Sequence, residues 1–160
     1  MSDLELHIHR CCFTGHRPEK LKRSEEEIKK SLEIEILKAV QDGYTTFITG
    51  LARGVDIWAG QIVLRLRQSN PNLRLIAALP YPICESRWSD FWKSQYTEVF
   101  NAANLVKCIS PKYSMASFQI RDEWMVDHSS RVIAVYDGTP GGTKNTIDYA
   151  NRCGVDIEYA

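Results

Sequence analysis

The chain has 160 residues, a length that suits a single domain, and its 44% hydrophobic and 25% charged residues are ordinary values for a globular protein. Lysine plus arginine and aspartate plus glutamate each number 20, so the formal net charge is zero, which argues against non-specific binding to nucleic acid. The five cysteines are odd in number and form no CxxC pair, which argues against a disulfide framework and against a zinc site.

The first half of the chain alternates between strand and helix patterns. Residues 9–13 predict a first strand, and residues 24–27 form a Ser-Glu-Glu-Glu capping box that begins a helix. Apolar residues recur at helical spacing as far as Val40, and Gly43 is a suitable helix stop. The β-branched and aromatic residues 44–49 predict the second strand.

The alternation continues to the C-terminus. Residues 55–66 place apolar side chains along one helix face, and Asn70-Pro71 breaks that helix. Further strands are predicted at 73–79, 105–109, 131–136 and 155–159, and further helices at 88–102, 115–128 and 143–152. This order predicts βαβ units, and hence one Rossmann-like three-layer α/β/α domain over residues 1–160 with a mainly parallel sheet.

The N-terminal residues carry no targeting pattern. No basic segment followed by an apolar stretch precedes the first predicted strand, and no apolar run approaches membrane-spanning length. We therefore expect a cytoplasmic protein with reduced thiols and no membrane partner.

In such sheets ligands bind outside the carboxyl ends of the strands, so the strand-to-helix turns are the candidate sites. The first turn contains Gly15, His16 and Arg17 directly after the first strand. Glycine permits close backbone approach to a ligand, and arginine can bind phosphate through two hydrogen bonds. The alternative is an ordinary turn with a solvent-facing arginine.

The second turn places Gly50, Arg53 and Gly54 before a strongly amphipathic helix. Free amides at a helix N-terminus attract anions, and the helix dipole adds to the effect. Asp56 lies in the first helical turn, where it is either a cap favoured by the dipole or an acceptor for a ligand hydroxyl.

The third turn runs into the helix at 143–152. Gly141 and Gly142 are followed by Thr143, a pattern typical of a backbone nest with a hydroxyl donor for phosphate, although it also fits a plain glycine-rich turn.

The four tryptophans, Trp58, Trp88, Trp92 and Trp124, fall on predicted helix faces. This position favours core or interface packing over ligand stacking. The tryptophan-rich third helix could therefore belong to the core or join copies in a homo-oligomer. No spacing assembles a nucleophile with a base, and no motif requires a metal or a cofactor.

Four segments together resemble the YpsA-like family, a largely uncharacterised bacterial family of the SLOG superfamily. They are residues 14–18, 50–56, 121–127 and 141–143, in this order along nearly the whole chain. That superfamily joins the DNA-processing protein A fold to the LONELY GUY phosphoribohydrolases. The resemblance implies a Rossmann-like fold and a nucleotide-type ligand.

Two relatives within the superfamily imply different functions. Residues 50–56 resemble the turn of the DNA-processing proteins, which bind single-stranded DNA. Arg121, Met125 and residues 140–142 resemble the signature of the phosphoribohydrolases, which cleave the N-glycosidic bond of nucleoside monophosphates. The catalytic glutamate of that signature falls on Thr146 in one register and on Asp148 in the ungapped register, so the phosphate cradle is better matched than the catalytic group.

The leading hypothesis is a protein that binds a nucleotide or nucleotide-derived phosphorylated ligand at the carboxyl edge of the sheet. The residues expected to hold phosphate or ribose are Gly15, His16, Arg17, Gly50, Arg53, Gly54, Gly141, Gly142 and Thr143. Asp56 would orient a hydroxyl or brace Arg53, and Arg121 would add a cation at the pocket rim.

Two alternatives stay open. The first is a nucleotide N-glycosidic hydrolase with Arg121 on the substrate and Asp56 or Asp148 as the acid or base. The second is a single-stranded DNA-binding module, against which the zero net charge and the lack of room for a second domain count.

Overall fold

The computed structural model describes residues 2–160, apart from the side chains of Asp3 and Leu4. The elements in chain order are α1 (Asp3–His7), β1 (Arg10–Gly15), the 3-10 helix η1 (Pro18–Lys20), α2 (Glu25–Gln41), β2 (Thr46–Thr49), α3 (Val55–Arg67), β3 (Arg74–Leu79), α4 (Asp90–Ala102), β4 (Leu105–Cys108), α5 (Ser117–Asp127), β5 (Arg131–Val135), α6 (Gly142–Arg152) and β6 (Asp156–Tyr159). No helix among residues 2–160 has the length and apolar character needed to cross a membrane.

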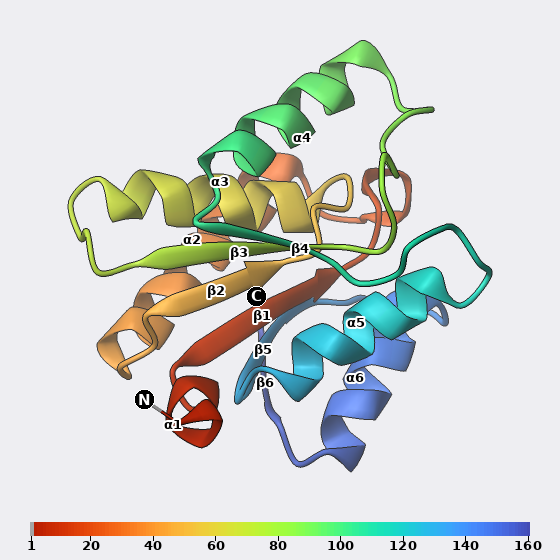
Figure 1. Cartoon of the computed structure of the whole chain (residues 1–160). Helices are drawn as coiled ribbons and strands as arrows, with labels where there is room; N and C mark the ends of the chain where they lie inside the picture. Colours follow the sequence, from red (N-terminus) through yellow and green to blue (C-terminus); the bar gives the residue numbers. More distant parts are fainter. Residues whose placement is uncertain (1) are drawn as a thin grey trace.

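The six strands form one sheet in the order β4-β3-β2-β1-β5-β6, and every neighbouring pair is parallel. Helices α2, α3 and α4 lie on one face of the sheet, and α5 and α6 lie on the other (Figure 1). This arrangement confirms the predicted Rossmann-like three-layer architecture with a parallel sheet. The strand order reverses between β1 and β5, which lie side by side with Gly15 opposite Val135.

Each face of the sheet has its own core. The larger core lies under α2, α3 and α4, where Phe13 and Phe47 stack with ring centroids 6.0 Å apart and Leu75 is fully buried. The smaller core lies under α5 and α6 and includes Met125 and Ala150. Helices covering both faces explain why the central strands are apolar on both sides.

Local signals in the sequence set most of the helix ends. The Ser24 hydroxyl accepts a hydrogen bond from the amide of Glu27 at 3.2 Å, as the capping box predicts, and Gly43 follows α2 with a φ of +99°. Several predicted boundaries differ from the structure by one or two residues. β1 continues through Gly15, and the third predicted helix begins at Asp90 because the Ser89 hydroxyl caps it. Helix α1 and the 3-10 helix were not predicted.

Candidate functional site

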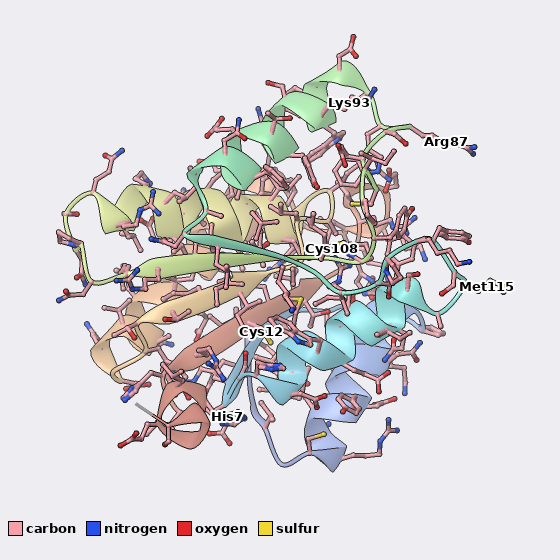
Figure 2. All side chains as sticks on the ribbon, viewed as in Figure 1. His7, Cys12, Arg87, Lys93, Cys108 and Met115 are labelled. Atoms are coloured by element: carbon pink, nitrogen blue, oxygen red, sulfur yellow. The ribbon has the colours of Figure 1, made fainter. Side chains whose placement is uncertain are left out.

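One large cavity lies at the carboxyl ends of the central strands. Its volume is about 1420 Å³, and it is lined by residues that follow β1, β2, β3 and β5 and by side chains of α3, α4 and α5. The loop after β3 and the loop before α5 wall it on one side, and Figure 2 shows Arg87 and Met115 at the outer ends of these two loops. The position agrees with the rule that ligands bind where the strand order of an open α/β sheet reverses.

The structure brings most of the candidate residues together in this cavity. Those that line it are Gly15, His16, Arg17, Gly50, Arg53, Asp56, Arg121, Gly141, Gly142 and Thr143. They come from the three predicted turns and from α5, which are distant in sequence. Gly54 and Asp148 do not line the cavity.

The geometry of the turn before α3 explains why residue 54 is a glycine. Gly54 precedes α3 with a φ of +90°, a conformation that side chains disfavour, and an added Cβ would lie 3.0 Å from the ring of Pro18. Gly15 likewise allows a close approach within the fold, because a Cβ there would lie 2.5 Å from a methyl carbon of Val55. Both glycines therefore bring α3 close to the end of β1.

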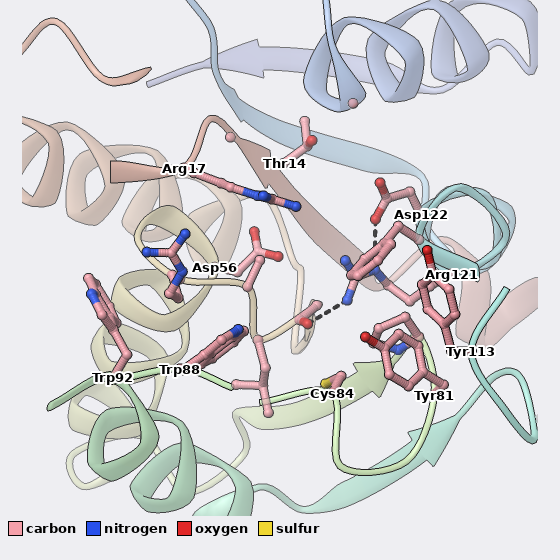
Figure 3. A pocket seen from close by; sticks show the side chains of 18 of the residues that line it. Thr14, Arg17, Asp56, Tyr81, Cys84, Trp88, Trp92, Tyr113, Arg121 and Asp122 are labelled. Carbon is pink, nitrogen blue, oxygen red and sulfur yellow. Dashed lines mark hydrogen bonds and ion pairs between the residues drawn. The ribbon is translucent and has the colours of Figure 1, made fainter. Parts of the chain in front are cut away.

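Arg121 lies under the cavity floor, and not at the rim as expected. Its side chain is 5% exposed. Its Nη1 donates hydrogen bonds to the carbonyl oxygens of Gly50 at 2.6 Å and Ala78 at 3.3 Å, and its Nε donates to Oδ1 of Asp122 at 2.7 Å (Figure 3). Arg121 thus ties α5 to the ends of β2 and β3, and its guanidinium is held in one place.

Asp56 shares this floor with Arg121. A Cβ on Gly50 would lie 2.7 Å from Oδ2 of Asp56 and 2.8 Å from Nη1 of Arg121, so both side chains pack closely against the backbone of Gly50. Burial raises the pKa of Asp56 from 3.8 to about 7, against the lowering effect of the Arg121 charge, and Asp122 adds to the rise. Near neutral pH this carboxyl group can therefore donate or accept a proton.

Arg53 has a different partner from the one expected. Its guanidinium forms an ion pair with Glu19, next to the cavity, a pairing that the sequence pattern did not indicate. No hydrogen bond or ion pair joins Asp56 to Arg53 among the described residues, so the structure does not show Asp56 bracing Arg53. Arg53 lines the cavity with part of its charge already neutralised.

Arg17 differs from Arg53 and Arg121, whose guanidinium groups already have partners in the protein. Its side chain is exposed, lines the cavity and extends across it above Asp56 (Figure 3). Within the part of the chain that the structure describes, its guanidinium makes no hydrogen bond and no ion pair. An unpaired guanidinium over a cavity is available to bind an anion.

His16 connects two of the turns. Its side chain is 5% exposed, and its Nε2 lies 2.9 Å from Oδ1 of Asp137, which follows β5. Hydrogen bonds from the hydroxyl and amide of Thr139, together with the charges of His16 and Lys22, lower the pKa of Asp137. His16 therefore holds the loop that leads to α6 against the end of β1.

The cavity is strongly basic although the chain is neutral. The basic side chains that line it are Arg17, Lys20, Arg53, Arg87, Lys112 and Arg121. Asp56 and Asp122 are the two lining carboxylates, and the raised pKa of Asp56 weakens its negative charge near pH 7. The net charge of zero therefore does not describe this face of the molecule, because the charges are unevenly distributed.

Aromatic residues at the cavity were not predicted. Trp88, Trp92, Tyr81, Tyr113 and Phe118 all line it. Tyr81 lies just after the third strand, so the strand-end rule that found the glycine turns could also have found it. The two tryptophans were assigned to a core or interface; both are half-buried and pack against the larger core, and they also line the cavity.

Residues 11–155 match the model of a protein family named YpsA and described as the YspA SLOG family. The chain belongs to this family. The resemblance drawn from the four sequence segments is thereby confirmed.

Relatives of this YpsA-family chain include a UPF0398 protein of Halalkalibacterium halodurans, which is 28% identical over 78% of the chain and 68% of the relative. The uncharacterized SPbeta prophage-derived protein YoqJ of Bacillus subtilis is 33% identical over 66% of the chain and 69% of its own length.

Two solved structures of DNA processing protein A share the fold. The Streptococcus pneumoniae protein has a TM-score of 0.60 at 15% identity, and this chain spans 50% of it. The Helicobacter pylori protein, whose single-stranded DNA binding mode has been described, has a TM-score of 0.67 at 18% identity over 98% of this chain and 66% of its own. At these identities the likeness establishes the fold alone.

The two positions suggested by the phosphoribohydrolase signature do not line the cavity. Thr146 is buried and donates hydrogen bonds to the Gly142 carbonyl at 2.9 Å and to Asp122 at 3.3 Å. Asp148 is half-exposed and pairs with Lys144 at 2.7 Å. Neither lines the cavity, so the structure does not bring Asp148 together with the other candidate residues.

Proposed function

We propose that the cavity binds a nucleotide or a nucleotide-derived phosphorylated ligand at the carboxyl edge of the sheet. The observation that carries the proposal is the unpaired guanidinium of Arg17 in a cavity with six basic side chains and two carboxylates. Such an excess of positive charge favours an anionic ligand.

The N-terminus of α6 supplies a second element for an anion. Gly141 precedes the helix with a φ of +146°, a conformation open to glycine, and an added Cβ at Gly141 or Gly142 would meet no atom within 4 Å. The first amides of a helix have no partner within the helix and carry its positive dipole end. Gly141, Gly142 and Thr143 all line the cavity, so these amides and the Thr143 hydroxyl suit a phosphate group.

The same cavity also offers groups that could bind the base and the ribose of a nucleotide. Aromatic rings on two sides offer stacking surfaces for a base. The carboxyl group of Asp56 lies on the floor, where it would bond a ribose hydroxyl. This assignment keeps one of the two roles expected for Asp56.

Calorimetric titration with adenosine and guanosine mono-, di- and triphosphates tests the proposal. We expect binding to the wild type and, for Arg17→Ala, a loss of affinity on the order of tenfold to a hundredfold, because a charge-assisted contact to phosphate is lost. Arg23→Ala is the matched control, since Arg23 lies outside the cavity and bonds the carbonyl of Ala160. Equal affinities of wild type and Arg17→Ala, or no binding at millimolar concentrations, would contradict the proposal.

Asp56 favours hydrolysis of the N-glycosidic bond as a second candidate function. A carboxyl group with a pKa near 7 inside the cavity can protonate the departing base or position the attacking water. Water would then add to C1′ of the ribose and the free base would leave with a proton. Chromatography of wild type and Asp56→Asn incubated with nucleoside monophosphates tests this: release of base by the wild type and none by the variant would support it.

A further inference from the structure

We propose that the ligand is a dinucleotide: two nucleosides joined through their phosphates, with one base on each of two aromatic clusters. This inference rests on the proposed function and names the class of ligand. Its first support is the size of the cavity. The volume of about 1420 Å³ exceeds the roughly 300–1,000 Å³ of pockets that enclose one small ligand.

The first cluster consists of Trp88, before α4, and Trp92, in its first turn. Trp88 meets Tyr96 edge to face at 5.6 Å between centroids, and Trp92 lies 6.3 Å from the ring of Trp58. Tyr96 and Trp58 are buried, so they support the two indoles from behind. Both indoles are half-buried and line the cavity, which leaves part of each ring for a ligand.

The second cluster consists of Tyr81, Tyr113 and Phe118, from the loop after β3 and the region where α5 begins. Tyr81 meets Tyr113 at 5.3 Å and Phe118 at 5.7 Å, both edge to face. Tyr113 is 60% exposed and Phe118 38% exposed. These large rings are exposed at the cavity and are not buried in the apolar core, so they can act as a stacking platform for a base.

Polar groups separate the two clusters. Figure 3 shows Trp88 and Trp92 on one side of the pocket, Tyr81 and Tyr113 on the other, and Arg17 with Asp56 between them. A ligand with one ring at each end would place its linking phosphates beside the Arg17 guanidinium. A mononucleotide has a single base and would leave one cluster empty.

Calorimetric titration of the wild type with four probes tests the inference: adenosine and guanosine monophosphate, and the corresponding dinucleosides joined 5′ to 5′ by two phosphates. We expect one dinucleotide to bind at least tenfold more tightly than its mononucleotide. A 12-nucleotide single strand of thymidine serves as a fifth probe, and we expect it to bind more weakly than that dinucleotide.

Two variants locate the bases. Trp88→Ala and Tyr113→Ala should each lower the dinucleotide affinity on the order of tenfold, the loss expected for one stacked base. The mononucleotide should lose affinity in only one of the two. Tyr159→Ala is the matched control, because Tyr159 is 56% exposed on β6 and lies outside the cavity. Since Tyr113 is exposed, its variant should fold even where Trp88→Ala does not.

The outcomes separate the two proposals. Equal affinities for mono- and dinucleotides, or variants that leave the dinucleotide affinity unchanged, would overturn the inference and leave nucleotide binding standing. Tighter binding of the 12-nucleotide strand than of either dinucleotide would overturn it in favour of single-stranded nucleic acid. Failure of all five probes to bind would overturn the proposed function as well.

Discussion

Replacing Asp56 with asparagine tests the electrostatics of the cavity floor without any ligand. Asp56 is 7% exposed, and its pKa rises from 3.8 to about 7 in the folded protein. The folded state therefore holds the Asp56 proton more tightly than the unfolded chain does. The stability that this group contributes is fully present below pH 3.8 and is lost as the pH rises toward 7.

The size of the effect follows from the shift. A shift of about three units corresponds to about 4 kcal/mol, and about two of those units lie between pH 5 and pH 8, or roughly 3 kcal/mol. Asparagine has nearly the same shape and does not ionise. Relative to the wild type, Asp56→Asn should therefore gain roughly 3 kcal/mol in free energy of unfolding between pH 5 and pH 8.

Urea unfolding followed by circular dichroism at the two pH values measures this difference. Asp148→Asn is the matched control, because Asp148 is 45% exposed and pairs with Lys144 at the surface, and its difference from the wild type should change little with pH. A difference between Asp56→Asn and wild type that is the same at pH 5 and pH 8 would refute the reasoning. It would mean that the charge of Arg121 outweighs the burial of Asp56.

Three further substitutions test other parts of the cavity. Gly50→Ala should lower the free energy of unfolding in urea by roughly 1–3 kcal/mol, because its Cβ would lie 2.7 Å from Oδ2 of Asp56; unchanged stability would refute the close packing. Gly142→Ala should keep its melting temperature in calorimetry, because its Cβ would meet no protein atom within 4 Å, but it should bind nucleotides more weakly, because the added methyl group would crowd a phosphate at the helix N-terminus; unchanged affinity would show that no phosphate lies there. Arg53→Ala should weaken nucleotide binding by less than roughly tenfold, because Glu19 already neutralises part of its charge, and a larger loss in titration would contradict this.

The fold and the three turns could be predicted because they depend on local patterns. Apolar periodicity identifies each strand and helix, and parallel strands bring all their carboxyl ends to one edge of the sheet. Gly15, Gly50 and Gly142 therefore meet at one cavity although they are far apart in sequence. Trp88 was predicted to lie inside the third helix, because the helical spacing of apolar residues extends to it. The helix in fact begins after Trp88, where the Ser89 hydroxyl caps it, and this capping signal is weaker in the sequence than the apolar spacing.

The electrostatics could not be predicted because they depend on packing. Whether Asp56 is charged depends on its burial and on Arg121, which reaches it from α5 on the opposite face of the sheet. The pairing of Arg53 with Glu19 likewise depends on how the loop after β1 lies against α3. A sum of charges over the chain contains neither fact, so it could not reveal a basic cavity in a neutral protein.

The cavity floor combines structural and electrostatic roles in the same few atoms. Arg121 holds the ends of β2 and β3 through the carbonyls of Gly50 and Ala78, and its charge also keeps the pKa of Asp56 from rising further. An anion bound above the floor would oppose the ionised form of Asp56 and favour the protonated form. The floor would thus become less negative as an anion arrives, with no movement of Arg121. Under the proposed function, a bound nucleotide would stabilise the proton on Asp56, which would link ligand binding to a carboxyl group whose pKa lies near 7.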